Sequence, residues 1–252
     1  MTIPTIDLIH KHGSVRKYKP DLVPQEMVET IVAAGQRAST SSNLQMFSVI
    51  AVSDSEKRIR LQELCGGQKH IGQAPIFLAW CTDLNRLDRI CKLQGFEQET
   101  GYIENFLLAT VDAAIASQNS ALAAESLGLG ICYIGGLRTH PRQVMDLLQT
   151  PHLVFPLVGM TLGWPLYPPR IRPRLPLNAV LHWENYSQDD QVNLYEYDQK
   201  MMASGIYKGR EVSGVQENQK KYGWMEHSAR RVSQAYRIEL REVLEEIGYL
   251  LK

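Results

Sequence analysis

Residues 102–136 decide how this chain folds, and they read YIENFLLATVDAAIASQNSALAAESLGLGICYIGG. The segment Tyr102–Leu127 contains neither proline nor glycine, and at about 1.5 Å per residue it predicts a helix roughly 40 Å long. Six alanines between Ala113 and Ala124 make this helix slim, which suits close packing against other helices. Gly128 is a suitable C′ residue to end it. We expect this helix at the centre of the molecule or of a dimer.

Shorter periodic segments flank this helix on both sides. The segment Gly163–Pro176 is rich in proline and arginine, so we predict no regular structure there. Helices alternate with a few strands, which leaves two fold classes open, α/β and α+β. We predict strands at Phe47–Val52, Ile76–Thr82, Ile131–Ile134 and Val154–Thr161, and helices at Thr5–Lys11, from Pro24 to the polar run at residues 39–43, and at Ser55–Leu64, Pro141–Leu148, Val192–Ala203 and Trp224–Leu251.

The composition is that of an ordinary globular protein. With 252 residues, 44% of them hydrophobic and 21% charged, the chain can bury one sizeable core or two modest ones. Lysine plus arginine and aspartate plus glutamate both total 27, so no net charge attracts nucleic acid or an anionic membrane. Any phosphate recognition must then come from a local group of basic residues, and we expect a small-molecule ligand.

The four cysteines, Cys65, Cys81, Cys91 and Cys132, are scattered along the chain. They form no C-x-x-C pair and no Cys/His spacing suited to zinc, so we expect no metal site. The N-terminus lacks the charged-then-apolar pattern of a signal peptide, and no run approaches the roughly 20 apolar residues that span a bilayer. We therefore expect a protein of the reducing cytoplasm that does not contact the membrane.

Two arginine-containing loops could bind a phosphate group. The loop His12-Gly13-Ser14-Val15-Arg16 combines a guanidinium, which can bind phosphate through two hydrogen bonds, with Ser and His donors. The segment Arg172-Pro173-Arg174 lies in a proline-stiffened stretch, where alternating arginines would project in one direction. Taken alone, each loop is explained more simply as a solvated basic loop.

A third loop, Tyr133-Ile134-Gly135-Gly136, directly follows a predicted strand. Paired glycines let a planar ring approach the backbone closely, although an ordinary turn at a strand end is an equally good interpretation. The nearby Gly128-Leu129-Gly130 is not a dinucleotide fingerprint. It follows a helix and precedes a strand, the reverse of the required order, and the third glycine is missing.

The order of these motifs is more specific than any one of them. The chain resembles the nitroreductase superfamily, and within it the oxygen-insensitive NADPH nitroreductases and NADPH-dependent flavin oxidoreductases. The resemblance is strong from Thr5 to Pro176 and looser from there to the C-terminus. The motifs that carry it are His12-x-Ser14-x-Arg16, Gly66-Gly67-Gln68-Lys69-His70, Ala124–Gly130, Tyr133–Arg138, Leu162-Gly163-Trp164-Pro165 and Arg172–Pro176.

The resemblance implies an α+β fold with a central, mainly antiparallel sheet wrapped by helices. It implies an intertwined homodimer in which two FMN molecules lie at the interface. Residues 1–252 would form a single domain, with an FMN-binding core at 1–176 and a C-terminal excursion at 177–252. That excursion would contain a mobile basic loop at about 205–222 and a terminal helix.

The resemblance also assigns residues to the site. Ser42 and Asn43 would lie over the face of the ring, and Arg210, Lys220 and Lys221 are the nearest counterparts of the arginines that bind the 2′-phosphate of NADPH in relatives. Arg172 stands where relatives have lysine, which keeps the charge but changes the donor geometry. The expected FMN contacts are His12, Gly13, Ser14, Val15, Arg16, Thr40, Gln68, Tyr133, Ile134, Gly135, Gly136, Arg172, Pro173 and Arg174.

The implied activity is hydride transfer from NADPH, through FMN, to nitroaromatics, quinones or free flavin by a ping-pong mechanism. Because the flavin carries the reaction, no catalytic side chain is expected. Two alternatives share the same site. One is a dedicated free-flavin reductase that supplies a partner monooxygenase, and the other is a flavin-binding redox sensor whose reductase activity is incidental.

Overall fold

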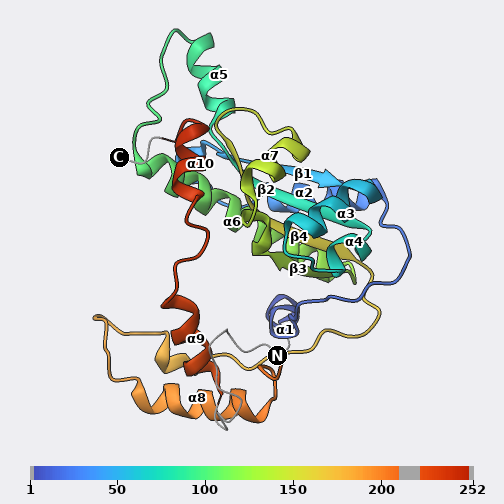
Figure 1. Ribbon diagram of the computed structural model, residues 1–252, viewed down its shortest axis with the longest axis vertical. Coiled ribbons are helices and arrows are strands. Elements are labelled where there is room, and N and C mark those ends of the chain that lie inside the picture. Colours follow the sequence, from blue (N-terminus) through green and yellow to red (C-terminus); the bar gives the residue numbers. More distant parts are fainter. Residues whose placement is uncertain (1–2, 210–221, 250–252) are drawn as a thin grey trace. The chain divides into compact units, whose positions relative to one another are not determined.

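The computed structural model describes residues 3–209 and 222–249 (Figure 1). The chain divides into two compact units, one made of Met1–Arg170 and Arg237–Lys252 and the other of Ile171–Tyr236. The predicted residues Arg210, Lys220 and Lys221 lie outside the described residues. Among the helices of the described part, none combines the length and apolar character that a membrane span requires.

The first unit is built on a four-stranded antiparallel sheet. Its strands are β1 (Phe47–Val52), β2 (Ile76–Asp83), β3 (Gly130–Ile134) and β4 (Val154–Gly163), in the order β1-β2-β4-β3. All four strands were predicted from their apolar runs, and the antiparallel sheet with flanking helices confirms the α+β class. Trp80 of β2 is opposite Val49 of β1 and Val158 of β4, which sets the register at the middle of the sheet.

Both faces of this sheet are covered, because all residues of β2 are buried. Side chains alternate between the faces along a strand. Leu78 and Trp80 belong to one buried cluster with helices α2 (Gln25–Gly35) and α6 (Ile103–Ser126). Phe77 and Ala79 belong to a second cluster on the opposite face. That face is covered by α3 (Ser55–Leu64) and α7 (Pro141–Leu148), and the short α4 (His70–Gln73) packs against α3.

The long central helix was predicted correctly, and it is α6. Its small side chains allow close packing: a Cβ at Gly35 of α2 would lie only 2.2 Å from Ser120 Oγ and 2.9 Å from the carbonyl oxygen of Ala116. Gly128 follows the helix with φ 83°, the left-handed conformation expected of a C′ glycine. The alanine-rich face of α6 is buried and comprises Ala109, Ala113, Ala116, Ala121 and Ala124.

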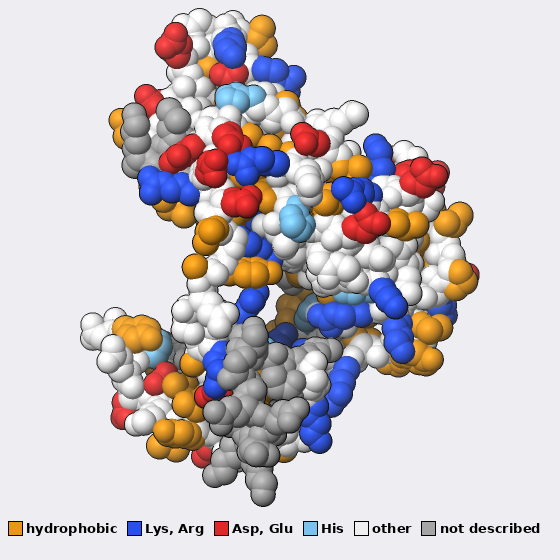
Figure 2. All heavy atoms as spheres, viewed as in Figure 1, with side chains coloured by type: hydrophobic (Ala, Val, Ile, Leu, Met, Phe, Trp, Pro, Cys, Tyr) orange, Lys and Arg blue, Asp and Glu red, His pale blue; other side chains and the backbone are white. Residues whose placement is uncertain are grey.

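A third cluster closes one end of the first unit. Helix α10 (Leu240–Glu246) contributes Val243 and Leu244 to it. The hydroxyl of Tyr249 lies 2.8 Å from Thr82 Oγ1 and donates to the carbonyl oxygen of Leu153 at 3.0 Å. On the face shown in Figure 2, lysine and arginine side chains alternate with aspartate and glutamate over α5 (Asn85–Leu93), α7 and α10. No broad charge of one sign covers that part of the surface.

The second unit contains η3 (Leu177–Ala179), α8 (Gln191–Ala203) and α9 (Trp224–Val232). Asp198 of α8 accepts the backbone N–H of Met225 at 2.8 Å, and the rings of Tyr197 and Trp224 meet edge to face at 5.3 Å. The sequence prediction of one helix over Trp224–Leu251 is wrong. The chain leaves the helix after Val232, and Arg237 has φ 58°, which an α-helix cannot contain.

Candidate functional site

Two adjacent glycines form the centre of the candidate site. Gly135 and Gly136 begin the 3₁₀ turn η2 (Gly135–Arg138), directly after β3. A Cβ at Gly136 would lie 2.6 Å from the carbonyl oxygen of Cys65 and 2.8 Å from Nε2 of Gln68. Gln68 is held there because its Nε2 donates to the same Cys65 carbonyl at 2.8 Å. The structure therefore brings Gln68 of one sequence motif together with Gly135 and Gly136 of another.

Two arginines converge above Gly135, and neither was predicted to belong to the site. A Cβ at Gly135 would lie 3.8 Å from a guanidinium nitrogen of Arg138 and 3.8 Å from one of Arg237. Burial lowers the pKa of Arg138, and the nearby charge of Arg237 lowers it further. Both arginines line a polar pocket of about 190 Å³ together with Thr139 and Glu239. Two converging guanidinium groups create a local positive potential suited to an anion.

Of these two arginines, only Arg138 carried a signal in the sequence, since it closes the Tyr133–Arg138 motif. Arg237 lies in the stretch predicted to be the middle of a helix, and only the fold brings it to Gly135. Tyr133 and Ile134 direct their side chains elsewhere: Ile134 is fully buried, and the Tyr133 hydroxyl donates to Ser117 Oγ at 3.1 Å. Ile134 can therefore meet a ligand only through its backbone, and the hydroxyl of the partly buried Tyr133 is engaged with α6.

The N-terminal loop is extended and alternates between buried and exposed residues. Gly13 and Val15 are buried, whereas Ser14 and Arg16 are exposed. The backbone N–H of Val15 donates to the carbonyl oxygen of Ile131 at 2.8 Å, which fixes the loop to β3. Gly130 accommodates this approach, because a Cβ there would lie 2.5 Å from a methyl group of Val15. Ser14 and Arg16 are thus presented to solvent from a firmly held backbone.

Arg16 lies near His70 at the start of α4. Burial lowers the pKa of His70, and the charge of Arg16 lowers it further. His70 is 8% exposed, and its Nε2 has no hydrogen-bond partner within the part of the chain that the structure describes. The motif Gly66–His70 therefore supplies a second polar group besides Gln68, at His70, a residue that was not predicted to belong to the site.

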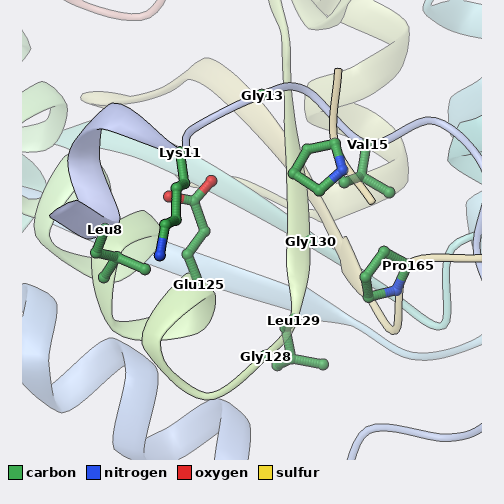
Figure 3. Close-up of a pocket in the computed structure, with 10 residues that line it drawn as sticks. Leu8, Lys11, Gly13, Val15, Glu125, Gly128, Leu129, Gly130 and Pro165 are labelled. Atoms are coloured by element: carbon green, nitrogen blue, oxygen red, sulfur yellow. The ribbon is translucent and has the colours of Figure 1, made fainter. Parts of the chain in front are cut away.

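His12 contacts α6 rather than the glycine pair. Its Nδ1 lies 2.6 Å from Oε1 of Glu125, in the last turn of the helix. Glu125 lines a largely apolar pocket of about 200 Å³ together with Leu8, Lys11, Gly13 and Leu129 (Figure 3). The structure therefore places His12 and Glu125 at the junction of the N-terminal loop, α6 and β3.

The loop before β1 carries Thr40, Ser42 and Asn43. Thr40 is extended and precedes η1 (Ser41–Asn43). Ser42 and Asn43 are exposed and have φ of 47° and 58°, in the left-handed region that residues other than glycine rarely occupy. Asp112 of α6 holds this loop through the backbone N–H groups of Ser41 and Met46, each at 3.0 Å.

The second unit contains the predicted residues Arg172, Pro173 and Arg174. The Pro173 carbonyl accepts the hydroxyl of Tyr197 at 3.3 Å, so this segment is tied to α8. The charge of Arg172 acts on Tyr207, where it opposes the rise in pKa that burial causes. Within the described ranges 3–209 and 222–249, no cluster of three or more His, Cys, Asp or Glu side chains could hold a metal ion.

Comparison with known proteins gives close matches over the whole chain. The family model described as "Nitroreductase family" matches residues 9–164, and "Nitroreductase family, C-terminal domain" matches residues 172–252. The chain is 37% identical to the oxygen-insensitive NADPH nitroreductase of Salmonella typhimurium over 246 residues, 98% of each chain. It is 37% identical to an FMN reductase [NAD(P)H] of Bacillus subtilis over 242 residues, 94% of each. The structure of the NADPH:FMN oxidoreductase from Vibrio harveyi complexed with NAD⁺ superposes with a TM-score of 0.87 at 34% identity, covering 98% of this chain and 99% of that one.

Proposed function

The chain belongs to the nitroreductase family, and from that premise we propose that it is an FMN-dependent oxidoreductase that uses NADPH as its electron donor. FMN, when bound, supplies the chemistry of hydride transfer from NADPH to an oxidising acceptor. NADPH and the acceptor occupy the same face in turn, in a ping-pong mechanism, and the acceptor is a nitroaromatic, a quinone or free flavin. The side chains bind and orient these molecules, and we assign none of them as acid, base or nucleophile.

The close packing at Gly136 is the observation that carries this proposal. The Cys65 carbonyl and the Gln68 amide leave no room for a side chain there, whereas the nearest atoms to a Cβ at Gly135 are arginine side-chain nitrogens at 3.8 Å. Gln68 is thereby held against a backbone that carries no side chains at residues 135–136, which a planar ring can approach closely. The residues present fit such a group. Gln68 and Nε2 of His70, which has no hydrogen-bond partner among the described residues, offer polar atoms, and the guanidinium groups above Gly135 stabilise negative charge on a ring.

The phosphate of FMN is assigned to basic and hydroxyl side chains. In the first unit these are His12, Ser14 and Arg16, which the buried Gly13 and Val15 hold in an extended loop. In the second unit they are Arg172 and Arg174. Charge-assisted hydrogen bonds from arginine to phosphate are the strong kind, and they select phosphate over neutral groups. Thr40, Tyr133, Ile134 and Pro173 complete the proposed FMN contacts.

NADPH and the acceptor are assigned to side chains outside the set that is proposed to bind the FMN phosphate. Ser42 and Asn43 present polar groups on an anchored, exposed loop. Arg138 and Arg237 line a polar pocket beside Gly135, where they provide positive charge for an anionic donor or acceptor. The proposed 2′-phosphate contacts Arg210, Lys220 and Lys221 belong to the loop outside the described residues.

A homodimer is part of this proposal, and the exposed side of α6 supports it. Ile103, Leu107, Val111 and Ile115 recur every fourth residue, and between 41% and 52% of each is exposed. Residues four apart lie on one face of a helix, so these four side chains form an apolar stripe. A stripe on one helix can pack against its own copy about a two-fold axis.

The proposal is tested by the visible spectrum of the purified protein before and after addition of NADPH under anaerobic conditions, with NADH in parallel. We expect a flavin absorbance that bleaches faster with NADPH than with NADH. Protein that binds no flavin after addition of FMN would refute the site. Flavin that stays oxidised with both nicotinamides would instead favour the redox sensor. The ratio of free-flavin to nitroaromatic turnover then separates a dedicated flavin reductase from a broad oxidoreductase.

A further inference from the structure

The pairing of His12 with Glu125 goes beyond the residues proposed to bind FMN. His12 Nδ1 lies 2.6 Å from Glu125 Oε1, and the side chains are 27% and 10% exposed. The two residues are separated by 113 positions in sequence, so this contact depends on the tertiary fold. It connects the N-terminal loop to the end of α6.

Glu125 occupies a position that is unfavourable for a carboxylate on local grounds. It lies in the last turn of α6, where the unpaired carbonyl groups of the helix make the potential negative. Its side chain is nine-tenths buried, and Oε2 has no hydrogen-bond partner among the described residues. Apolar residues of the adjoining pocket, among them Leu8 and Leu129, reduce its contact with water. A buried carboxylate of this kind needs a hydrogen-bond donor to be tolerated.

His12 is that donor, and the chemistry of the contact fixes the state of its ring. An ionised carboxylate can only accept hydrogen bonds, so the proton between the two residues resides on Nδ1. Nε2 is the nitrogen that remains for a ligand, and it donates to an anion when it also carries a proton. A doubly protonated ring donates from both nitrogens, to Glu125 and to the anion.

We propose that Glu125 is a positioning residue that holds the His12 ring, through its Nδ1 proton, for contact with the phosphate of FMN. This role rests on the proposed function. Two other ionisable groups face Glu125. Lys11 lines the same pocket, where Figure 3 shows it beside Glu125. Burial raises the pKa of Tyr133 of β3, and the negative charge of Glu125 raises that pKa further. Neither has a described hydrogen bond to Glu125, so His12 is the residue through which Glu125 acts.

The test compares FMN with riboflavin, which lacks the phosphate, in binding to flavin-free protein. Glu125→Gln keeps the shape of the side chain but removes its charge. We expect FMN to bind about tenfold more weakly to this variant, the size of one charge-assisted hydrogen bond, whereas riboflavin affinity stays within about twofold. Glu63→Gln, which loses an exposed ion pair with Arg60, is the matched control and should change neither affinity.

A double-mutant cycle separates positioning from general stabilisation. If Glu125 acts through His12, adding Glu125→Gln to His12→Ala should change FMN affinity by less than about twofold. Additive losses, equal losses for both flavins, or an unchanged FMN affinity in Glu125→Gln would each overturn the proposal. Wild-type protein that binds no flavin would overturn the proposed function, and this role with it.

A measurement on the unmodified protein does not depend on the variants folding. In ¹⁵N-histidine-labelled, flavin-free protein, the His12 resonances, assigned by their loss in His12→Asn, should show a protonated Nδ1. Addition of FMN should then shift Nε2 toward the protonated position, and riboflavin should not. A His12 ring protonated on Nε2 alone would contradict the pairing with Glu125.

Discussion

Asp112 and Ser41 are joined by a hydrogen bond from the Ser41 backbone N–H to Asp112 Oδ1 at 3.0 Å. The second oxygen of the same carboxylate accepts the N–H of Met46 at 3.0 Å, and Asp112 is only 1% exposed. Between these two anchors, Ser42, Asn43 and Gln45 all have positive φ. One buried side chain of α6 therefore bridges the two ends of a strained loop that carries residues proposed to face the acceptor.

Replacement of Asp112 tests this anchor. In Asp112→Asn, the amide NH₂ group would face one of the two N–H donors, leaving a buried donor without a partner. We expect the free energy of unfolding to fall by about 1–3 kcal/mol, measured by urea denaturation. The KM for acceptors should rise more than that for NADPH. Asp88→Asn, in an exposed ion pair with Lys92, is the control. Equal stability of the two variants would show that the anchor does not hold the loop.

Alanine substitutions at the two adjacent glycines are expected to have opposite effects. At Gly136 a methyl group would lie 2.6 Å from the Cys65 carbonyl, so Gly136→Ala must displace backbone. At Gly135 its nearest neighbours would be arginine side-chain nitrogens at 3.8 Å, an ordinary contact. We expect Gly136→Ala to cost about 1–3 kcal/mol of stability and to lose FMN, and Gly135→Ala to fold normally. Thermal unfolding and the ratio of flavin to protein absorbance measure both. A Gly136→Ala protein with normal stability and a full complement of FMN would contradict the proposed close packing.

The apolar stripe on α6 predicts how the dimer can be disrupted. Val111→Asp would place a charge in the proposed interface, and we expect a shift toward monomer in light scattering together with a loss of bound FMN. Ile59→Asp on α3 is the matched control, since Ile59 is 51% exposed and Val111 is 52% exposed. If both variants remain dimeric, α6 does not form the interface. If both dissociate, the effect is not specific to the stripe.

The cysteines should differ in reactivity. Burial raises the pKa of the Cys65 thiol to about 12, and the charge of Arg237 only partly opposes this rise. Cys91 is partly exposed on α5. Because the thiolate is the reactive form, we expect iodoacetamide at about pH 8.5 to label Cys91 well before Cys65. Mass spectrometry of peptides over time checks this order. Simultaneous labelling would show that the packing around Gly136 opens readily.

The periodicity of apolar residues was sufficient to predict the longer helices and the strands. The four strands and α3, α6 and α7 were predicted close to their observed bounds, because apolar periodicity records which face of each segment is buried. Helix α2 was predicted to continue to the polar run at residues 39–43, but it ends at Gly35. The short helices α4 and α5 were missed, since α4 has only one turn and α5 leaves no residue buried. The break between α9 and α10 was also missed. It depends on where Val243 and Leu244 pack, in the cluster with Phe155 and Tyr249.

The sequence by itself determined the central helix and three candidate loops, since each follows from composition or spacing over a few residues. The choice of α+β over α/β came from the order of the motifs, through the family resemblance. Only the tertiary structure decided that Arg237 lies beside Arg138 above Gly135, that Asp112 holds the loop at Ser41, and that His12 pairs with Glu125. These contacts join residues far apart in the chain. Their charges and hydrogen bonds are local in space but not in sequence, so no periodicity or motif records them until packing of α6 on the sheet brings them together.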